Sequence, residues 1–273
     1  AAPRSPREAA IHAARPVVRR VGRATASLRR PPEFLIVGAQ RCGTTSMFKT
    51  IAQHPDVAPP LLHKGVHYFD TDHHRGHEWY VGHFPIRRRG RISGESSPYY
   101  LFHPLAAGRI ATELPGVRAL VLLRDPVERA YSAHAHELAR GFESLPFEAA
   151  LAAEEGRLDG EEDRIVADPS YRSHAHQHHA YLARGHYADQ LRRLEAVLGR
   201  DRIHVVDADD FFTDPEPVFS EVAAFLGLRP VEGIRFERHN ARPRSRMPDG
   251  LRRELRDRLE AADEDLAQWW GRV

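Results

Sequence analysis

An apolar run that passes directly into a glycine-rich turn is the feature that most restricts the fold of this chain. Residues 34–37 read FLIV and residues 38–46 read GAQRCGTTS. A buried strand followed by such a turn and a helix is typical of α/β proteins, where the turn amides and the helix N-terminus can hold an anion. The alternative is that Gly38 and Gly43 only make a tight turn. The turn alone leaves both interpretations open.

Apolar runs and helical periodicities alternate along the rest of the chain, as expected for a parallel sheet with crossover helices. Strands are predicted at residues 34–37, 91–97, 118–123 and 202–207. Helices are predicted at residues 44–53, 104–113, 126–140, 146–155, 187–198 and 215–226, with a last one from Pro248 onward. The very apolar run at 118–123 is expected near the centre of the sheet.

The composition describes a globular chain with one main domain. Its 273 residues are 41% hydrophobic and 29% charged, with a mean hydropathy of −0.53. No stretch of about 18 apolar residues predicts a membrane span. Forty basic against 38 acidic residues give a net charge of only +2. No overall field therefore favours nucleic acid as a partner.

The first 32 residues differ from the rest. Residues 1–32 are rich in arginine and proline and are predicted to form a basic N-terminal arm, whereas residues 33–273 form the main domain. We expect a solvated or loosely packed arm, with weak contact to an anionic membrane surface as the alternative. The single cysteine, Cys42, excludes an internal disulfide and predicts a reducing, cytoplasmic location.

The glycine-rich turn lacks the lysine of an ATP-hydrolysing P-loop. A Walker loop has the spacing G-x-x-x-x-G followed by lysine and then serine or threonine. Here Thr44 follows Gly43. A P-loop kinase that uses ATP is therefore disfavoured, although it stays as an alternative. Cys42 is interpreted as a small side chain of the turn in preference to a reactive thiol.

Four segments in order resemble the sulfotransferases that use 3′-phosphoadenosine-5′-phosphosulfate (PAPS), in particular their heparan-sulfate-like and bacterial branch. FLIVGAQRCGTTSMFKTIAQHPDV is similar to the family's 5′-phosphosulfate loop and helix, and LVLLRDPVERAYSAHAH to its 3′-phosphate motif. HKGVHYFD and GESSPYYL are similar to two further segments, so the resemblance covers about residues 34–240.

The resemblance implies a P-loop-like three-layer α/β fold, with a central, mostly parallel sheet flanked by helices. It also implies transfer of the PAPS sulfuryl group to a hydroxyl or amine of a glycan, lipid or small molecule. The product would be adenosine 3′,5′-bisphosphate (PAP), and the transfer would need no metal.

The resemblance assigns the nucleotide-binding residues. Those around the 5′-phosphosulfate are Gly38, Gln40, Arg41, Cys42, Gly43, Thr44, Thr45 and Ser46. Arg124 and Ser132 are expected to hold the 3′-phosphate, with a surface ion pair of Arg124 to Asp125 or Glu128 as the alternative. Arg242 and Arg244, in the loop HNARPRSRM, either cover the nucleotide or belong to a solvated loop.

The catalytic residues depart from the family pattern. In the heparan-type relatives a glutamate base directly follows the lysine of the HKGVHYFD segment, but here Gly65 follows Lys64. By resemblance Lys64 points at the sulfuryl group or the acceptor. His67 is the preferred replacement base because imidazole titrates near neutrality, and Glu95 is the second candidate. His67 as a structural residue, and a chain that binds PAPS or PAP without turnover, are the alternatives.

Arg41 stands where the family usually has lysine. Its guanidinium keeps the positive charge but cannot give up a proton, so its help to the leaving group is expected to be electrostatic.

Two groups of histidines raise the question of a metal. They are His73, His74 and His77, and His174, His176, His178 and His179. Closely spaced imidazoles can bind zinc, but no carboxylate at a fixed spacing accompanies them. We interpret them as part of an acceptor-binding rim and expect no metal site.

Overall fold

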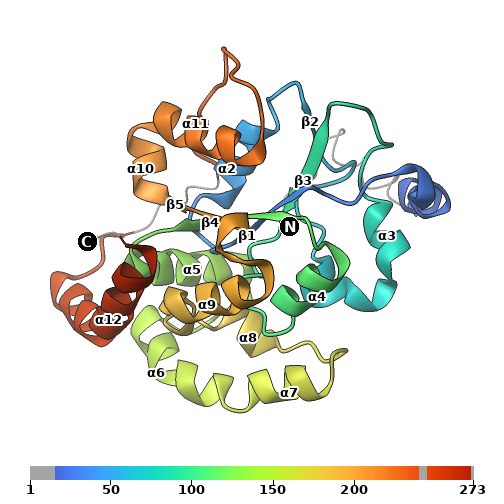
Figure 1. Cartoon of the computed structure of the whole chain (residues 1–273). Coiled ribbons are helices and arrows are strands. Elements are labelled where there is room, and N and C mark those ends of the chain that lie inside the picture. Colours follow the sequence, from blue (N-terminus) through green and yellow to red (C-terminus); the bar gives the residue numbers. More distant parts are fainter. Residues whose placement is uncertain (1–15, 240–244, 272–273) are drawn as a thin grey trace.

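The computed structural model describes residues 16–239 and 245–271 and contains one five-stranded sheet with the order β2-β3-β1-β4-β5 (Figure 1). The strands are β1 (Phe34–Gly38), β2 (Val57–Ala58), β3 (Ile92–Ser96), β4 (Arg118–Leu123) and β5 (Ile203–Asp207). Every pair of neighbouring strands in this sheet is parallel. The carboxyl ends of all five strands therefore share one edge, where ligands bind in open α/β sheets.

Helices cover both faces of the sheet. The helices are α2 (Thr44–Ile51), α3 (His77–Val81), α4 (Ala106–Glu113), α5 (Pro126–Arg140), α6 (Phe147–Leu158), α7 (Glu161–Ala167), α8 (His174–His178), α9 (Tyr187–Leu198), α10 (Ala208–Thr213), α11 (Pro215–Leu226) and α12 (Asp249–Trp270). Figure 1 shows α2, α10 and α11 on one face and α4, α5 and α9 on the other, with α6, α7 and α8 beneath them. This arrangement confirms the predicted three-layer α/β fold.

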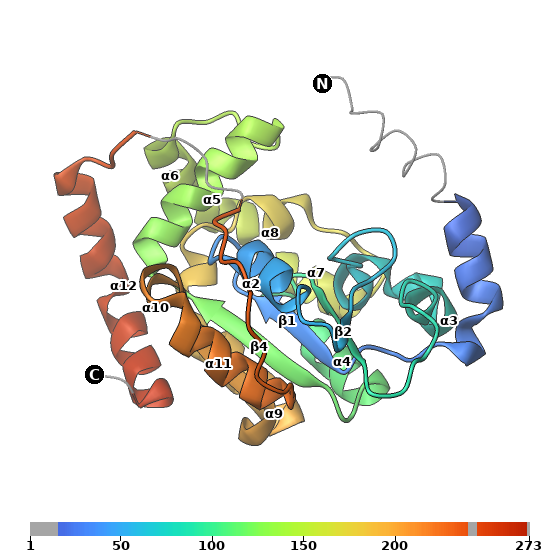
Figure 2. The ribbon, with the colours of Figure 1, turned by 90° about the horizontal axis from the view of Figure 1, so that it is seen from above.

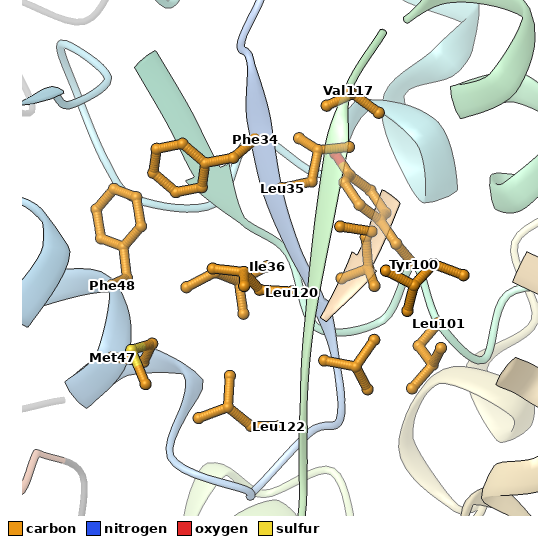
Figure 3. Close-up of a cluster of buried hydrophobic side chains, with 14 of the residues drawn as sticks. Phe34, Leu35, Ile36, Met47, Phe48, Tyr100, Leu101, Val117, Leu120 and Leu122 are labelled. Carbon is orange, nitrogen blue, oxygen red and sulfur yellow. The ribbon is translucent and has the colours of Figure 1, made fainter. Parts of the chain in front are cut away.

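The core explains why β1 and β4 have no polar positions except at one end. All five residues of β1 are buried, and in β4 only Arg118 is exposed. Figure 3 shows Phe34 and Ile36 on the side of Met47 and Phe48 from α2, and Leu35 on the side of Tyr100. Strands buried on both faces read as continuous apolar runs, which made them visible in the sequence.

The long elements match the predictions and the short ones were missed. The four predicted strands and all seven predicted helices are present, with shifts of a few residues at their ends. The 118–123 strand lies inside the sheet, although β1 has the middle position. The two-residue β2 and the short helices α3, α7, α8 and α10 were not predicted. Elements this short show no periodic pattern of apolar residues.

The N-terminal segment packs against α3. Residues 16–24 are helical, Gly22 lies against the carbonyl of Gly82, and the Arg19 guanidinium is 5.8 Å from the centre of the Trp79 ring. The described part of the arm is thus attached to the domain, whereas the boundary predicted at residue 33 stays a prediction. No helix within residues 16–239 and 245–271 has the length and apolar character to span a membrane.

Candidate active site

The glycine-rich turn connects β1 to α2 at the carboxyl edge of the sheet. Gly43 caps α2 with φ at 84°, and a Cβ atom there would lie 2.9 Å from the Phe212 ring. Arg41 also has a left-handed backbone, with φ at 74°. The turn therefore presents the N-terminus of α2, with Thr44 and Thr45, to a cavity beside the sheet. A helix N-terminus favours an anion.

Helix α5 supplies the next wall of this cavity. Asp125 accepts a hydrogen bond from the Glu128 amide (2.7 Å) and so caps the helix, as its Asp-Pro start predicts. Ser132, His136 and Arg140 follow at intervals of four, which places them along one helical face. Of these three residues only Ser132 was predicted, although the spacing is visible in the sequence.

Arg41 bridges the turn and α5. Its Nε donates to Ser132 Oγ at 3.1 Å, and its Nη1 lies 3.5 Å from His136 Nδ1. Arg41 was predicted to bind at the 5′-phosphosulfate and Ser132 at the 3′-phosphate. Their direct contact means that the two proposed anion positions are adjacent.

Lys64 lines the same cavity from a separate segment that precedes β3. The Ser96 amide donates to the Lys64 carbonyl at 2.7 Å, which attaches this segment to the end of β3. Lys64 Nζ donates to the Ser96 carbonyl and hydroxyl, both at 3.3 Å. Burial lowers the pKa of Lys64 to about 8, although the Glu95 carboxylate partly offsets this. The ammonium group is thus a desolvated cation near neutral pH.

His67 is paired with a buried carboxylate. Its Nδ1 lies 2.8 Å from Oδ2 of Asp70, whose side chain is fully buried while that of His67 is 40% exposed. Burial alone would lower the pKa of His67, but the charge and hydrogen bond of Asp70 outweigh it and raise that pKa. Asp70 therefore holds the ring through Nδ1 and leaves Nε2 for another partner.

Gly65 cannot take the family glutamate in this conformation. A Cβ atom on Gly65 would lie 2.6 Å from the Ser96 carbonyl oxygen and 3.5 Å from His67 Nε2. The first distance is too short for any side chain unless the backbone moves. His67 Nε2 thus lies beside the place where the glutamate side chain would begin.

Glu95 has a different environment from His67. Its side chain is completely buried and accepts hydrogen bonds from the Val66 amide (2.6 Å) and from the hydroxyls of Ser97 (2.7 Å), Tyr80 (2.9 Å) and Tyr100 (2.8 Å). Burial raises its pKa, and these hydrogen bonds oppose that shift. Glu95 does not line the cavity. Its burial and its four hydrogen bonds argue against a role of Glu95 as base. They favour a structural role, in which Glu95 fixes the segment that carries Lys64 and His67.

These walls enclose a cavity of about 270 Å³ that is strongly basic. Its lining residues are Gln40, Arg41, Thr44, Thr45, Lys64, His67, Pro98, Tyr99, His136, Arg140, Gln177, His178 and Arg184. This set contains three arginines, a lysine and three histidines but no carboxylate. Such a cavity can hold a multiply charged anion.

A buried polar network behind the cavity was not predicted. Gln40 Oε1 accepts from Arg184 (2.6 Å), and its amide nitrogen donates to Glu137 at 3.4 Å. The other oxygen of Glu137 lies 2.9 Å from His178 Nδ1. Burial would raise the pKa of Glu137, but the hydrogen bond and charge of His178 lower it. These residues come from four separate segments, so no local pattern could have grouped them.

Arg124 is not among the residues that line this cavity. It is 3.5 Å from Glu128 and 4.0 Å from Asp209, and its side chain is 19% exposed. The ion pair with Glu128 is the alternative that the sequence left open. A 3′-phosphate held by Arg124 would have to compete with that carboxylate. Arg242 and Arg244 lie outside the described residues.

The other predicted loop residues have mainly structural contacts. Cys42 is buried, and burial raises its pKa to about 11, so its thiol is protonated at neutral pH. Ser46 Oγ accepts from the His239 amide at 2.9 Å. Gly38 lies against Leu101, where a Cβ atom would be 2.5 Å from that side chain. Any contribution of these three residues to anion binding would come from the backbone.

The histidine groups have carboxylate partners that the sequence did not reveal. His73 Nε2 and His77 Nδ1 lie 2.6 and 2.8 Å from the two oxygens of Glu113. His178 is paired with Glu137. Within the described ranges, no group of three or more histidine, cysteine, aspartate or glutamate residues is arranged to hold a metal ion.

Comparison with known proteins identifies the class that this fold and cavity represent. The family described as the sulfotransferase domain matches residues 31–243. The chain belongs to this family, as the resemblance of its motifs predicted.

The chain is similar to human proteins and to a solved bacterial structure. Bifunctional heparan sulfate N-deacetylase/N-sulfotransferase 3 of Homo sapiens is 28% identical over 77% of this chain, which spans 24% of that protein. Heparan sulfate glucosamine 3-O-sulfotransferase 6 of Homo sapiens is 29% identical over 84% of this chain and 69% of its own. A solved sulfotransferase from Alicyclobacillus acidocaldarius is 30% identical, with a TM-score of 0.72, over 89% of this chain and 97% of that one.

Proposed function

We propose that this protein transfers the sulfuryl group of PAPS to a hydroxyl or amine acceptor and releases PAP. The observation that carries the proposal is the meeting of Arg41, Lys64 and His67 at one carboxylate-free cavity beside the N-terminus of α2. The two cations, Arg41 and Lys64, can pair with the negative charge of a phosphosulfate. The imidazole of His67, when neutral, can accept the proton of the acceptor group. A metal is not part of the proposal.

The transfer can be written with these residues in defined roles. His67 Nε2 takes the proton of the acceptor O–H or N–H while Asp70 stabilises the imidazolium. The acceptor atom forms a bond to sulfur as the bond between sulfur and the 5′-phosphate oxygen breaks. The electron pair of that bond leaves with PAP, and Arg41 and Lys64 balance the charge that develops along this path.

The acceptor class rests on the relatives' names and on the chemistry of the cavity. The two human relatives above are named for heparan sulfate, so glycans are the first acceptors to screen. Because the chain spans only a quarter of the bifunctional relative, lipids and small hydroxylated molecules belong in the same screen. A cytoplasmic location stays a prediction.

A thermal melt distinguishes this proposal from an ATP-using kinase. PAP should bind in the micromolar range or tighter and raise the melting temperature, whereas ATP, which lacks a 3′-phosphate, should raise it much less. Equal shifts from PAP and ATP would overturn the nucleotide assignment. Turnover of labelled PAPS with an acceptor panel then separates an enzyme from a protein that only binds PAP.

A further inference from the structure

A second cavity, of about 480 Å³, lies at the opposite edge of the sheet from the active site. Its lining includes Glu33, just before β1, and Ile92 and Ser93 at the start of β3. The active-site turn follows the carboxyl end of β1. Because the strands are parallel, the two cavities open at opposite ends of the sheet.

Two chain segments form the outer rim of this second cavity. The Arg87 amide donates to the Leu28 carbonyl at 3.1 Å, and Arg29 and Ile86 form an antiparallel bridge. Apolar side chains on this rim are exposed to water. Ile86, in the bridge, is 52% exposed, and Leu61 on the same rim is 46% exposed. The cavity lining also includes the apolar residues Ala58, Pro59, Pro85 and Ile92.

The rim is also strongly basic. The cavity is lined by Arg29, Arg30, Arg87, Arg88 and Arg91, against one carboxylate, Glu33. Glu33 is paired with Arg30 at 3.2 Å. Arg87 and Arg88 are exposed, have no ion pair with a described residue and continue into exposed Arg89. The rim of this cavity therefore combines arginines that form no ion pair with a described residue and exposed apolar side chains.

We propose that this rim docks the protein on a bilayer that contains anionic phospholipids. Ile86 and Leu61 would enter the interfacial layer, and the arginines would bind acidic headgroups. A hydrophilic polyanion could bind the arginines but would not bury the exposed apolar side chains. A bilayer, which has acidic headgroups above an apolar layer, matches both features.

The helix at residues 16–24 extends the same surface. Figures 1 and 2 both place it on the side of the molecule that carries the loop leading into β3. Val17 and Val21 are 65% and 51% exposed, and Arg20 and Arg23 are exposed between and beside them. Docking through this side would leave the active-site cavity open to water at the other end of the sheet.

Vesicle sedimentation of the full chain tests the proposal. Binding should be weak to pure phosphatidylcholine, strong to phosphatidylcholine with phosphatidylglycerol, and reduced by salt. The double variant Arg87→Glu/Arg88→Glu should lose at least about tenfold in affinity, since each basic residue near an acidic surface contributes roughly a fivefold factor. Ile86→Ser should lose a few-fold.

Matched variants on other surfaces provide the controls. Arg253→Glu/Arg258→Glu makes the same charge change on exposed positions of α12, and Val166→Ser removes an apolar side chain that is also 52% exposed. Both should bind vesicles like the wild type, and every variant should keep its melting shift with PAP. Equal binding to neutral vesicles, or equal losses in the controls, would overturn the proposal. Binding to soluble heparin with no binding to vesicles would assign the rim to a polyanion instead.

Discussion

The two walls of the active-site cavity are built differently. The wall with Arg41 and Ser132 consists of a strand, a glycine-capped helix and one face of α5. The wall with Lys64 and His67 is a segment with few regular elements. His67 has a left-handed backbone there, and the Val66 amide of this segment donates to the buried Glu95 carboxylate of β3. The first wall uses features that any anion-binding α/β protein can have. The second depends on contacts between this segment and residues at the end of β3.

The two walls also differ in how they compare with the pattern that the resemblance implies. The regular wall has the cation Arg41 where a lysine is implied, whereas the irregular wall has Gly65 where a glutamate is implied. The Ser96 carbonyl occupies the space where its Cβ would lie. The His67–Asp70 pair supplies a titrating group beside that place. We therefore expect changes in the irregular wall to affect turnover, and changes in the regular wall to affect nucleotide binding.

The largest effect is expected at His67. His67→Ala should lower the transfer rate by about 10²–10⁴-fold, the usual contribution of a general base, and leave PAP affinity nearly unchanged. His67→Asn is the backbone-matched variant, because asparagine tolerates a left-handed φ and cannot serve as the base. Single-turnover kinetics with labelled PAPS and calorimetry with PAP measure the two quantities.

Glu95→Gln is the control for this assignment. It should lower the melting temperature, because one amide nitrogen would face donors in a fully buried site, and it should affect transfer less than the His67 variants do. A larger loss of turnover in folded Glu95→Gln than in His67→Ala would move the base to Glu95. If neither change slowed transfer, the irregular wall would not carry the base.

A smaller effect is expected at Arg124. Arg124→Ala should weaken PAP binding by roughly 1.5–3 kcal/mol, as for the loss of a charge-assisted contact to phosphate. Glu128→Gln should tighten PAP binding, because it removes the carboxylate that now pairs with Arg124. Calorimetry measures both, with Arg192→Ala as the surface control, since Arg192 is paired with Asp265 elsewhere. Unchanged affinity in folded Arg124→Ala would remove Arg124 from the nucleotide site.

The smallest effect concerns pH. In the proposed mechanism, transfer needs a neutral His67 and a charged Lys64. The raised pKa of His67 should place the acid limb above the ordinary value of about 6.5, and the Lys64 pKa of about 8 should set the alkaline limb. The pH–rate profile should therefore be a narrow bell. Asp70→Asn removes the charge that raises the pKa of His67, so the acid limb should move to lower pH. An acid limb that stays in place would separate Asp70 from the proton transfer.

The sequence by itself determined the fold and the regular wall. Helices cover both sides of the sheet, so strands such as 34–37 and 118–123 must be apolar on both faces. This requirement produces consecutive apolar residues, which are visible in the sequence. The turn from Gly38 to Gly43 and the Asp125-Pro126 start of α5 are local signals of the same kind. These features need only neighbouring residues, so they could be predicted from the chain.

Only the tertiary structure decided the irregular wall and the environment of each charge. Glu137 beside Gln40 and His178, and Glu113 beside His73 and His77, are pairings set by how segments far apart in the sequence pack. Burial also gives the two candidate bases different environments. Glu95 is fully buried and its oxygens accept hydrogen bonds, whereas His67 lines the cavity. The pKa and the role of an ionisable group depend on desolvation and on partners distant in sequence, which no local pattern contains.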